Sequence, residues 1–260
     1  MKLKHISLVL LACVALVYTA CKKSSSSQTV DSKTVSSQIA LNLAQTLYSG
    51  FGGFNITTGL SAPGTFGVDH NKIRLNMTKG RLGVNSIGGN ITCGLHADTT
   101  FSSSVTVDGG QATVAGSIGF TFNCTGSTFS GFTVTDNLKV TEATAQVNGT
   151  FNVAENLTAA QVNPGVDTSN VSLNGTASFA ENAKVSGKST TASFNYTFHN
   201  IIIDHLGTIV SGSADFATQA SGASGTWNYS GTATFLGNSL VKIVINGASY
   251  TVNLQTGAVS

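Results

Sequence analysis

Residues 112–124 of the chain read ATVAGSIGFTFNC, and this stretch decides the fold class. Val114, Phe120 and Phe122 fall on alternate positions, and the positions between the apolar residues hold mainly small and polar side chains. A period of two is typical of a β-strand with one buried and one solvated face. The stretch therefore predicts a long half-buried strand that ends with Cys124 on its apolar side.

The same theme returns three times further along the chain as a loose Gly-x-small-x-Phe pattern. The spacing between the copies is too uneven for a solenoid repeat. We interpret the pattern as a small-to-large taper on the inner face of a curved sheet, where glycine allows coiling or close approach and phenylalanine fills the wide end. The three copies are Gly175-Ala177-Phe179, Gly212-Ala214-Phe216 and Gly231-Ala233-Phe235.

Alternation predicts further strands over most of the chain. The predicted ranges are 54–60, 66–77, 91–97, 101–107, 129–141, 144–154, 169–173, 190–203 and 207–217. The chain closes on a hairpin, in which Val241, Ile243 and Ile245 alternate up to Asn246-Gly247 and Tyr250, Val252 and Leu254 return. Asn-Gly between alternating apolar residues is the strongest short hairpin signal.

One helix is predicted before the strands, over residues 34–49. Val35, Ile39, Leu43 and Leu47 recur at steps of four and form an apolar stripe. Thr34 is the predicted N-cap, and Gly50 begins the glycine-rich stop. An isolated helix of this length is marginal in water, so we expect its stripe to pack on the strands.

The sequence thus predicts a mainly β fold, an antiparallel meander with one N-terminal amphipathic helix. The meander can form a curved sheet, a half-barrel or barrel, or a two-layer sandwich. Pro63 and Pro164 mark loops, and the β pattern is the same on both sides of Pro164. We therefore expect one β domain over residues 50–260, with two domains dividing near 158–168 as the alternative.

Residues 1–20 have the features of an export signal, with a basic head and an apolar run that is too short to span a membrane. Tyr18-Thr19-Ala20-Cys21 resembles a bacterial lipobox, although Tyr18 departs from the usual aliphatic residue. Cleavage before Cys13 would leave an apolar start on the mature chain. We therefore predict cleavage after Ala20 and acylation of Cys21, with palmitate among the chains. The alternative is an ordinary secretory signal.

A Ser-rich segment, 21–33, follows and is predicted to be a flexible tether. The Cys21-Lys22-Lys23-Ser24 start, this polar spacer and the closing stretch from Asn246 to Leu254 resemble cell-envelope lipoproteins of Bacteroidota-type bacteria. The resemblance implies a location, the outer membrane facing either the periplasm or the outside. It implies no activity and no functional residue.

Charge excludes one class of partner. Charged residues make up only 9% of the chain, and segment 1–20 contains two of the 13 basic residues, which leaves basic and acidic residues equal in number. Nucleic-acid binding requires clustered Lys and Arg and has no support. Lys72, Arg74, Lys79 and Arg81 are the nearest approach to a basic patch, and alternation favours a solvated strand face for them.

Cys93 and Cys124 are the cysteines that remain after Cys13 is removed and Cys21 is acylated. Both are predicted to lie on the apolar faces of their strands. An even pair in an oxidising compartment predicts a disulfide, with two buried thiols as the alternative.

No residue pattern for catalysis or for a cofactor stands out. His199, Asp204 and His205 could meet around a turn, but no HxH, HExxH or CxxC spacing supports a metal site. The nucleophile motifs G-x-S-x-G and S-x-x-K are absent. A carboxylate pair for glycoside hydrolysis could come from six acids, and Glu142 and Glu155 are interpreted as loop or edge residues. The six acids are Asp98, Asp108, Asp136, Glu142, Glu155 and Glu181.

We therefore expect a membrane-anchored, non-enzymatic envelope module, structural or ligand-binding, with an apolar or glycan ligand. A lipid or lipoprotein carrier with an apolar cavity, a hydrolase and a surface-assembly role are the alternatives. Trp227 and Tyr229 are the candidate ligand-contact aromatics, with packing in the core as the competing role.

Overall fold

The computed structural model describes one helix, a large sheet and four short strands. The described residues are 29–48, 54–55, 59–60, 75–76, 83–84, 93–107, 110–145, 147–166, 169–185, 187–223 and 225–260. The predicted signal 1–20, Cys21 and most of the tether lie outside them, as do Gly50 and the four basic residues between 72 and 81. Among the described residues, no helix is long and apolar enough to cross a membrane.

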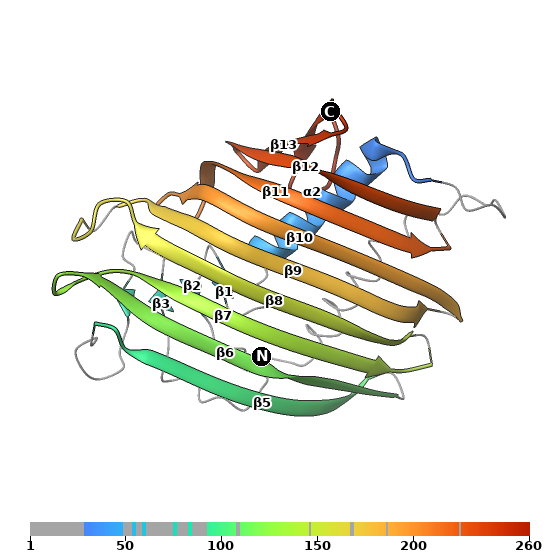
Figure 1. Cartoon of the computed structure of the whole chain (residues 1–260), viewed down its shortest axis with the longest axis horizontal. Coiled ribbons are helices and arrows are strands. Elements are labelled where there is room, and N and C mark those ends of the chain that lie inside the picture. Colours follow the sequence, from blue (N-terminus) through green and yellow to red (C-terminus); the bar gives the residue numbers. More distant parts are fainter. Residues whose placement is uncertain are drawn as a thin grey trace.

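Ten antiparallel strands form the large sheet and follow one another in chain order (Figure 1). Each strand pairs with its sequence neighbours, so the sheet is a meander with β5 and β14 at its two edges. The strands are β5 (His96–Val107), β6 (Gly110–Thr125), β7 (Thr128–Ala143), β8 (Val147–Gln161), β9 (Val171–Val185), β10 (Lys188–Ile203), β11 (Ile209–Gly222), β12 (Gly225–Gly237), β13 (Leu240–Ile245) and β14 (Ala248–Asn253).

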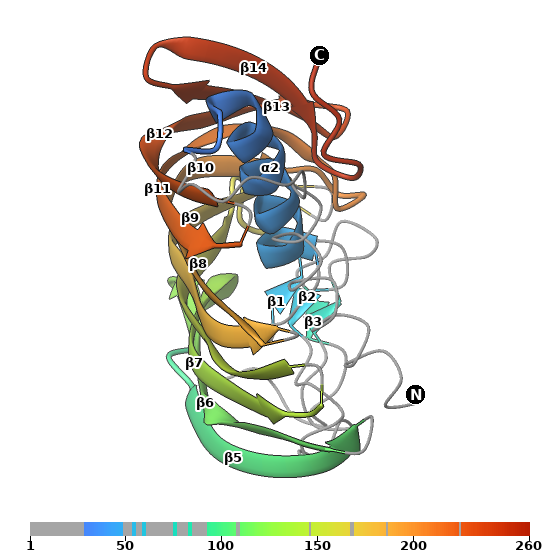
Figure 2. The ribbon, with the colours of Figure 1, turned by 90° about the vertical axis from the view of Figure 1, so that its right-hand side faces the viewer.

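The sheet is curved and open. Figure 2 shows it as a bent layer with helix α2 (Ser32–Tyr48) on its concave side, which we call the inner face. The meander with one N-terminal helix is as predicted, and of the predicted forms the described strands adopt the open curved sheet rather than a closed barrel. β8 and β9 pair from Val147 to Gln161, so the sheet continues across the loop that contains Pro164.

Alternation explains why these residues form strands. Along β7, Phe132, Val134, Leu138 and Val140 are buried, and Thr133, Thr135, Asn137 and Lys139 on the other face are exposed or half-buried. Several observed strands are longer than predicted, because cross-strand hydrogen bonding continues through polar residues. The predicted range 101–107, for example, is part of the longer strand β5, which begins at His96. Of the predicted range 91–97, only residues 96–97 belong to β5, and residues 93–95 precede it.

Helix α2 packs its predicted stripe against the sheet. Val35, Ile39, Leu43 and Leu47 are fully buried and share one hydrophobic cluster with inner-face residues of β6 to β14. Burial of a side chain of this size contributes about 1.5–3 kcal/mol, which compensates for the weakness of an isolated helix.

The predicted N-cap of this helix is wrong by one turn. Asp31 rather than Thr34 is the cap, because its Oδ1 accepts the backbone N–H of Thr34 at 3.0 Å. The other oxygen, Oδ2, accepts the Thr34 hydroxyl at 2.8 Å. These hydrogen bonds lower the pKa of Asp31, as expected for a carboxylate at a helix N-terminus.

The closing hairpin is confirmed. β13 pairs with β14 from Leu240 opposite Asn253 to Ile245 opposite Ala248. Asn246 and Gly247 form the turn with φ angles of 50° and 81°. Two consecutive positive φ angles are what a two-residue hairpin of this twist requires, and Asn-Gly supplies them at low cost.

Glycines of the repeated pattern allow close approach between strands. Gly175 and Gly212 have positive φ angles of 132° and 119°, and they lie beside an irregularity in β10 near residues 199–202. A Cβ on Gly175 would collide with the backbone of Asn156 on β8. Glycine at such a position lets a strand bend, which agrees with the predicted role of the pattern in a curved sheet.

Four two-residue strands lie between α2 and β5. β1 (Phe54–Asn55) pairs with β2 (Gly59–Leu60), and β3 (Leu75–Asn76) pairs with β4 (Gly83–Val84). The predicted single strand over 54–60 is therefore two short strands. Of the predicted strand over 66–77, only β3 lies within the described residues.

Candidate functional site

Four acidic side chains of β7, β8 and β9 are buried at positions where apolar residues would be expected. Asp136, Glu142, Glu155 and Glu181 are only 6%, 8%, 5% and 4% exposed. Each is in phase with buried apolar neighbours, as Asp136 is with Val134 and Leu138. Burial of a charged group is costly, so these positions are candidates for function rather than for stability.

Asp136 and Glu155 form a pair across β7 and β8. They stand directly opposite each other in the strand register, and the backbone N–H of Glu155 donates to Asp136 Oδ1 at 3.0 Å. The two carboxyl groups also form a side-chain hydrogen bond with each other, for which one shared proton is the donor. Among the described residues, Asp136 Oδ2 and Glu155 Oε2 have no hydrogen-bond partner outside the pair.

The electrostatics of this pair follow from its burial. Desolvation raises the pKa of both carboxyl groups, and the negative charge of Glu155 raises the pKa of Asp136 further. Two carboxylates so close together cannot both ionise easily. We therefore expect the pair to retain a proton at neutral pH.

Glu181 is a separate buried acid on β9. It stands opposite Phe151 of β8 and Ala192 of β10. Neither carboxyl oxygen has a hydrogen-bond partner within the described part of the chain, and burial raises the pKa of Glu181 to about 7. It differs from Glu155 because it has no neighbouring acid that shifts its pKa.

Glu142 and Glu155 correct the sequence interpretation. Both were expected in loops or at edges, but they are buried on the interior strands β7 and β8. The expectation assigned charged residues to solvated positions, whereas both are in phase with the apolar residues of their strands. This phase is the signal in the sequence that could have identified the acidic positions of the inner face.

A small pocket lies between Glu155 and the helix. It has an internal volume of about 30 Å³, which is room for one or two water molecules. Its lining residues come from three elements: Asn42, Gln45 and Thr46 from α2, Val153 and Glu155 from β8, and Ala177, Ser178 and Phe179 from β9. The pocket therefore has polar side chains from α2, the carboxyl group of Glu155 from β8, and apolar side chains from β8 and β9.

A protonated acid next to a carboxylate can exchange a proton with a bound group. That property suits general acid–base catalysis, and glycoside hydrolases use two carboxyl groups in this way. It also suits the binding of a hydrogen-bond donor or a cation. Within the described residues, no group of three His, Cys, Asp or Glu side chains could hold a metal ion.

The candidate ligand-contact aromatics both make contacts within the chain. Trp227 is buried, and its Nε1 donates to Thr218 Oγ1 at 3.1 Å. Tyr229 is half-buried, and its hydroxyl donates to the carbonyl oxygen of Val30 at 2.9 Å. Tyr229 therefore helps to fix the segment that leads into α2.

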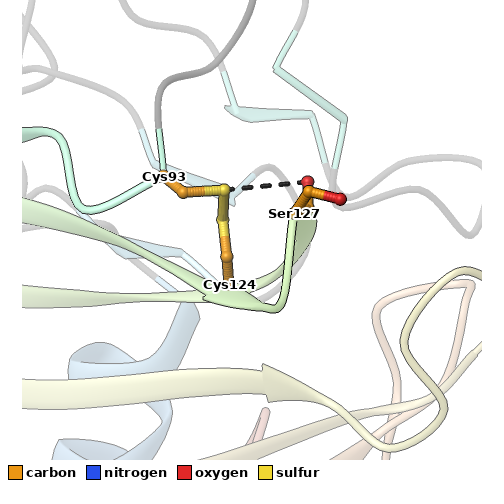
Figure 3. Close-up of a disulfide and its surroundings, with 3 residues drawn as sticks. All are labelled: Cys93, Cys124 and Ser127. Carbon is orange, nitrogen blue, oxygen red and sulfur yellow. Dashed lines mark hydrogen bonds between the residues drawn. A yellow bond between two sulfur atoms is a disulfide. The ribbon is translucent and has the colours of Figure 1, made fainter.

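The predicted disulfide between Cys93 and Cys124 is present, with the Cα atoms 5.6 Å apart (Figure 3). Cys93 was expected on the apolar face of a strand, but it lies exposed in a turn before β5, because the chain turns at Gly94, whose φ is 76°. Its Sγ lies 3.8 Å from the carbonyl oxygen of Ser127. The bridge thus joins the turn before β5 to the end of β6.

His199 and Asp204, which were considered together for a metal site, make separate contacts. His199 Nε2 lies 2.9 Å from Asp215 Oδ2 on the exposed outer face. Asp204 Oδ1 instead accepts the backbone N–H groups of Leu206 and Thr208, which shapes the turn between β10 and β11. The turn therefore has a structural explanation.

A second His–Asp pair lies at the β5 edge. His96 Nε2 is 2.6 Å from Asp98 Oδ2, and His96 Nδ1 is 2.8 Å from Thr121 Oγ1. This order of groups is similar to a catalytic triad, but His96 and Asp98 are more than half exposed. An effective triad requires a shielded site with oxyanion donors, so the inner-face acids are the stronger candidate.

Comparisons with protein-family models, with curated proteins and with solved structures found no match to this chain. The functional argument therefore depends on the residues and their geometry.

Proposed function

We propose that this protein is an exported, lipid-anchored module of the cell envelope, non-enzymatic and structural or ligand-binding, held at the outer membrane through Cys21. The observation that carries the proposal is the Cys93–Cys124 disulfide. Disulfides persist in oxidising compartments and are rare in the cytosol. The bridge thus supports export independently of the features of residues 1–20.

The path of the chain into the fold is compatible with an anchor at Cys21. Val30 donates its backbone N–H to the carbonyl oxygen of Thr226 at 2.9 Å, so the segment before α2 is fixed to β12. Only residues 22–28 separate Cys21 from the first described residue, Thr29. Seven extended residues span at most about 25 Å, which would keep the β12 side of the sheet close to the membrane.

A ligand for the curved sheet, apolar or glycan, stays a prediction. The pocket beside Glu155 is too small for an acyl chain, so it gives no support to a lipid carrier. A hydrolase is the second candidate, because Asp136 and Glu155 form a buried pair of acids. Hydrolysis that survives the substitution Glu155→Gln would exclude this pair as its catalytic centre.

Substitution of Cys21 tests the anchor. We expect Cys21→Ser to reduce the incorporation of labelled palmitate to background, because serine has no thiol to form the lipid thioether, and without it the cleavage that frees the amine for a further acyl chain does not follow. Cys13→Ser is the matched control and should label like the wild type. Labelling that survives in Cys21→Ser, or disappears in Cys13→Ser, would refute the assignment.

A further inference from the structure

Strand β5 ends the large sheet without the features that usually protect an edge strand. Among the described strands it pairs with β6 alone, and the pairing has no register shift from His96 opposite Thr121 to Val107 opposite Gly110. Natural edge strands are usually short, bulged or covered, or they contain lysine or proline. β5 is 12 residues long and contains no Lys, Arg or Pro. Its backbone is therefore open to a further strand.

The opposite edge of the sheet, β14, is protected. It is only six residues long. The end of the chain lies against it, because the backbone N–H of Ser260 donates to the carbonyl oxygen of Thr251 at 2.9 Å, and Val252 forms a bridge with Val259. Figure 2 shows β5 and β14 at the two ends of the sheet. Of the two, β5 is the edge that can accept a strand.

Hydrogen bonding determines which backbone groups of β5 point outward. The N–H of Phe122 on β6 donates to the carbonyl oxygen of Leu95 at 2.9 Å, and bonded and non-bonded residue pairs alternate along an antiparallel ladder. The odd-numbered residues of β5 therefore bond to β6, and the even-numbered residues direct N–H and C=O away from the sheet. These residues have exposed side chains and are His96, Asp98, Thr100, Ser102, Ser104 and Thr106.

A second copy of β5 is complementary to this edge. The outward groups of two antiparallel copies pair only when even-numbered residues lie opposite even-numbered residues. With a two-fold axis at Phe101, all six outward residues of each copy find a partner, which gives about twelve new backbone hydrogen bonds. A shift of two residues in either direction leaves one outward residue of each copy without a partner. The favoured register places His96 opposite Thr106, Asp98 opposite Ser104 and Thr100 opposite Ser102.

The charges on β5 also permit pairing with a second copy. Asp98 is the one acidic residue of the strand, and it is already paired with His96. In the favoured register the two copies of Asp98 lie six residues apart along the ladder, about 20 Å, which exceeds the screening length at physiological salt. An edge with so little charge offers no attraction to a charged peptide, whereas its own copy matches it.

Hydroxyl groups on the outer face add to the match. Thr100 of one copy would lie beside Ser102 of the other, and hydroxyl pairs of this kind form hydrogen bonds across strands. The chain already contains such a contact between β5 and β6, where Ser104 Oγ lies 2.9 Å from Thr113 Oγ1. The side chains therefore favour the same register as the backbone.

We propose that two copies of this chain pair antiparallel through β5, around Phe101, and join their sheets into one continuous sheet. A two-fold contact of this kind is closed, and the covered β14 edge prevents growth at the other end. The inference goes beyond the proposed function and does not depend on the lipid anchor. The segment that leads from Cys21 is fixed to β12, on the other side of the sheet, and leaves β5 accessible.

Native mass spectrometry of the full chain, extracted from membranes in mild detergent, tests the proposal. The wild type should have twice the mass of one chain. Ser102→Lys places two like charges close to the axis and should weaken self-association by about tenfold or more. Asn182→Lys is the matched control, because Asn182 is exposed on the outer face of the interior strand β9. It should dimerise like the wild type.

A proline variant tests the backbone hydrogen bonds directly. Ser102→Pro removes an outward N–H and leaves the ladder with β6 intact, because Ser102 does not donate to β6. It should also weaken self-association by about tenfold or more. Ser102→Ala keeps the N–H and should dimerise like the wild type. The Tm of each variant shows whether it is folded, and Ser102→Lys decides the question if the proline variant is not.

The proposal is overturned if the wild type has the mass of one chain, or of one chain bound to a different protein. It is also overturned if a folded Ser102→Lys or Ser102→Pro variant dimerises like the wild type, or if Asn182→Lys loses the dimer. None of these outcomes bears on the anchor, since palmitate labelling at Cys21 is measured separately.

Discussion

We expect the free energy of unfolding to fall as pH rises from about 4.5 to 9, because buried acids that are neutral in the folded protein must ionise. The pKa of Glu181 is raised from 4.5 to about 7 by burial. In this window the folded state binds more protons than the unfolded state, so stability decreases with rising pH. The contribution of Glu181 is present at pH 4.5 and lost above pH 7, and it amounts to about 3 kcal/mol.

Glu181→Gln removes this contribution, since the amide cannot ionise. The variant should match the wild type near pH 4.5 and be more stable by up to about 3 kcal/mol at pH 8, as measured by urea unfolding at several pH values. A residual slope should remain, because burial also raises the pKa of Asp136 and of Glu155.

Asn182→Gln is the control for substitution on β9, because Asn182 is the next residue and is exposed on the outer face. It should leave the pH dependence unchanged. A wild-type stability that is constant from pH 5 to pH 9, or a Glu181→Gln variant with the wild-type slope, would show that Glu181 is not a buried neutral acid.

Loss of the disulfide should have an effect of similar size. The bond closes a loop with a sequence separation of 31 residues, and in the chain-entropy model this stabilises the fold by about 3–4 kcal/mol. The double variant Cys93→Ser/Cys124→Ser should lose that amount. Because β5 is an edge strand that pairs only with β6 among the described strands, hydrogen exchange should become fastest in β5.

Reduction provides the control for this prediction. A reducing agent should destabilise the wild type by the same amount and leave the double variant unchanged. The wild type can also be denatured without a reducing agent and its free thiols titrated. If Cys93 and Cys124 then react as two free thiols, the bond does not form in the native protein.

The parts of the fold that local sequence determines were predicted correctly. The apolar stripe of α2 and the Asn246-Gly247 turn are encoded within a few neighbouring residues. The helix start was wrong by one turn, because Asp31 and Thr34 are both good caps and the sequence does not distinguish them. Several strands were predicted too short, because polar residues within a strand were read as its ends.

The candidate site was not predicted, although its residues were among the six acids considered. What selects Asp136 and Glu155 is the register of β7 against β8, which places them opposite each other. That register depends on the pairing of whole strands and is not visible in either segment alone. The buried position of each acid, by contrast, could have been found from its phase with Val134, Val153 and their neighbours.

The central claim is that the domain is exported, oxidised and anchored through Cys21, and the intact mass of protein extracted from membranes tests it most directly. The account predicts a chain that begins at Cys21, carries covalently bound acyl chains and lacks the two hydrogens lost in the Cys93–Cys124 bond. A chain that retains residues 1–20, or one that begins at Cys21 without acyl groups, would contradict it.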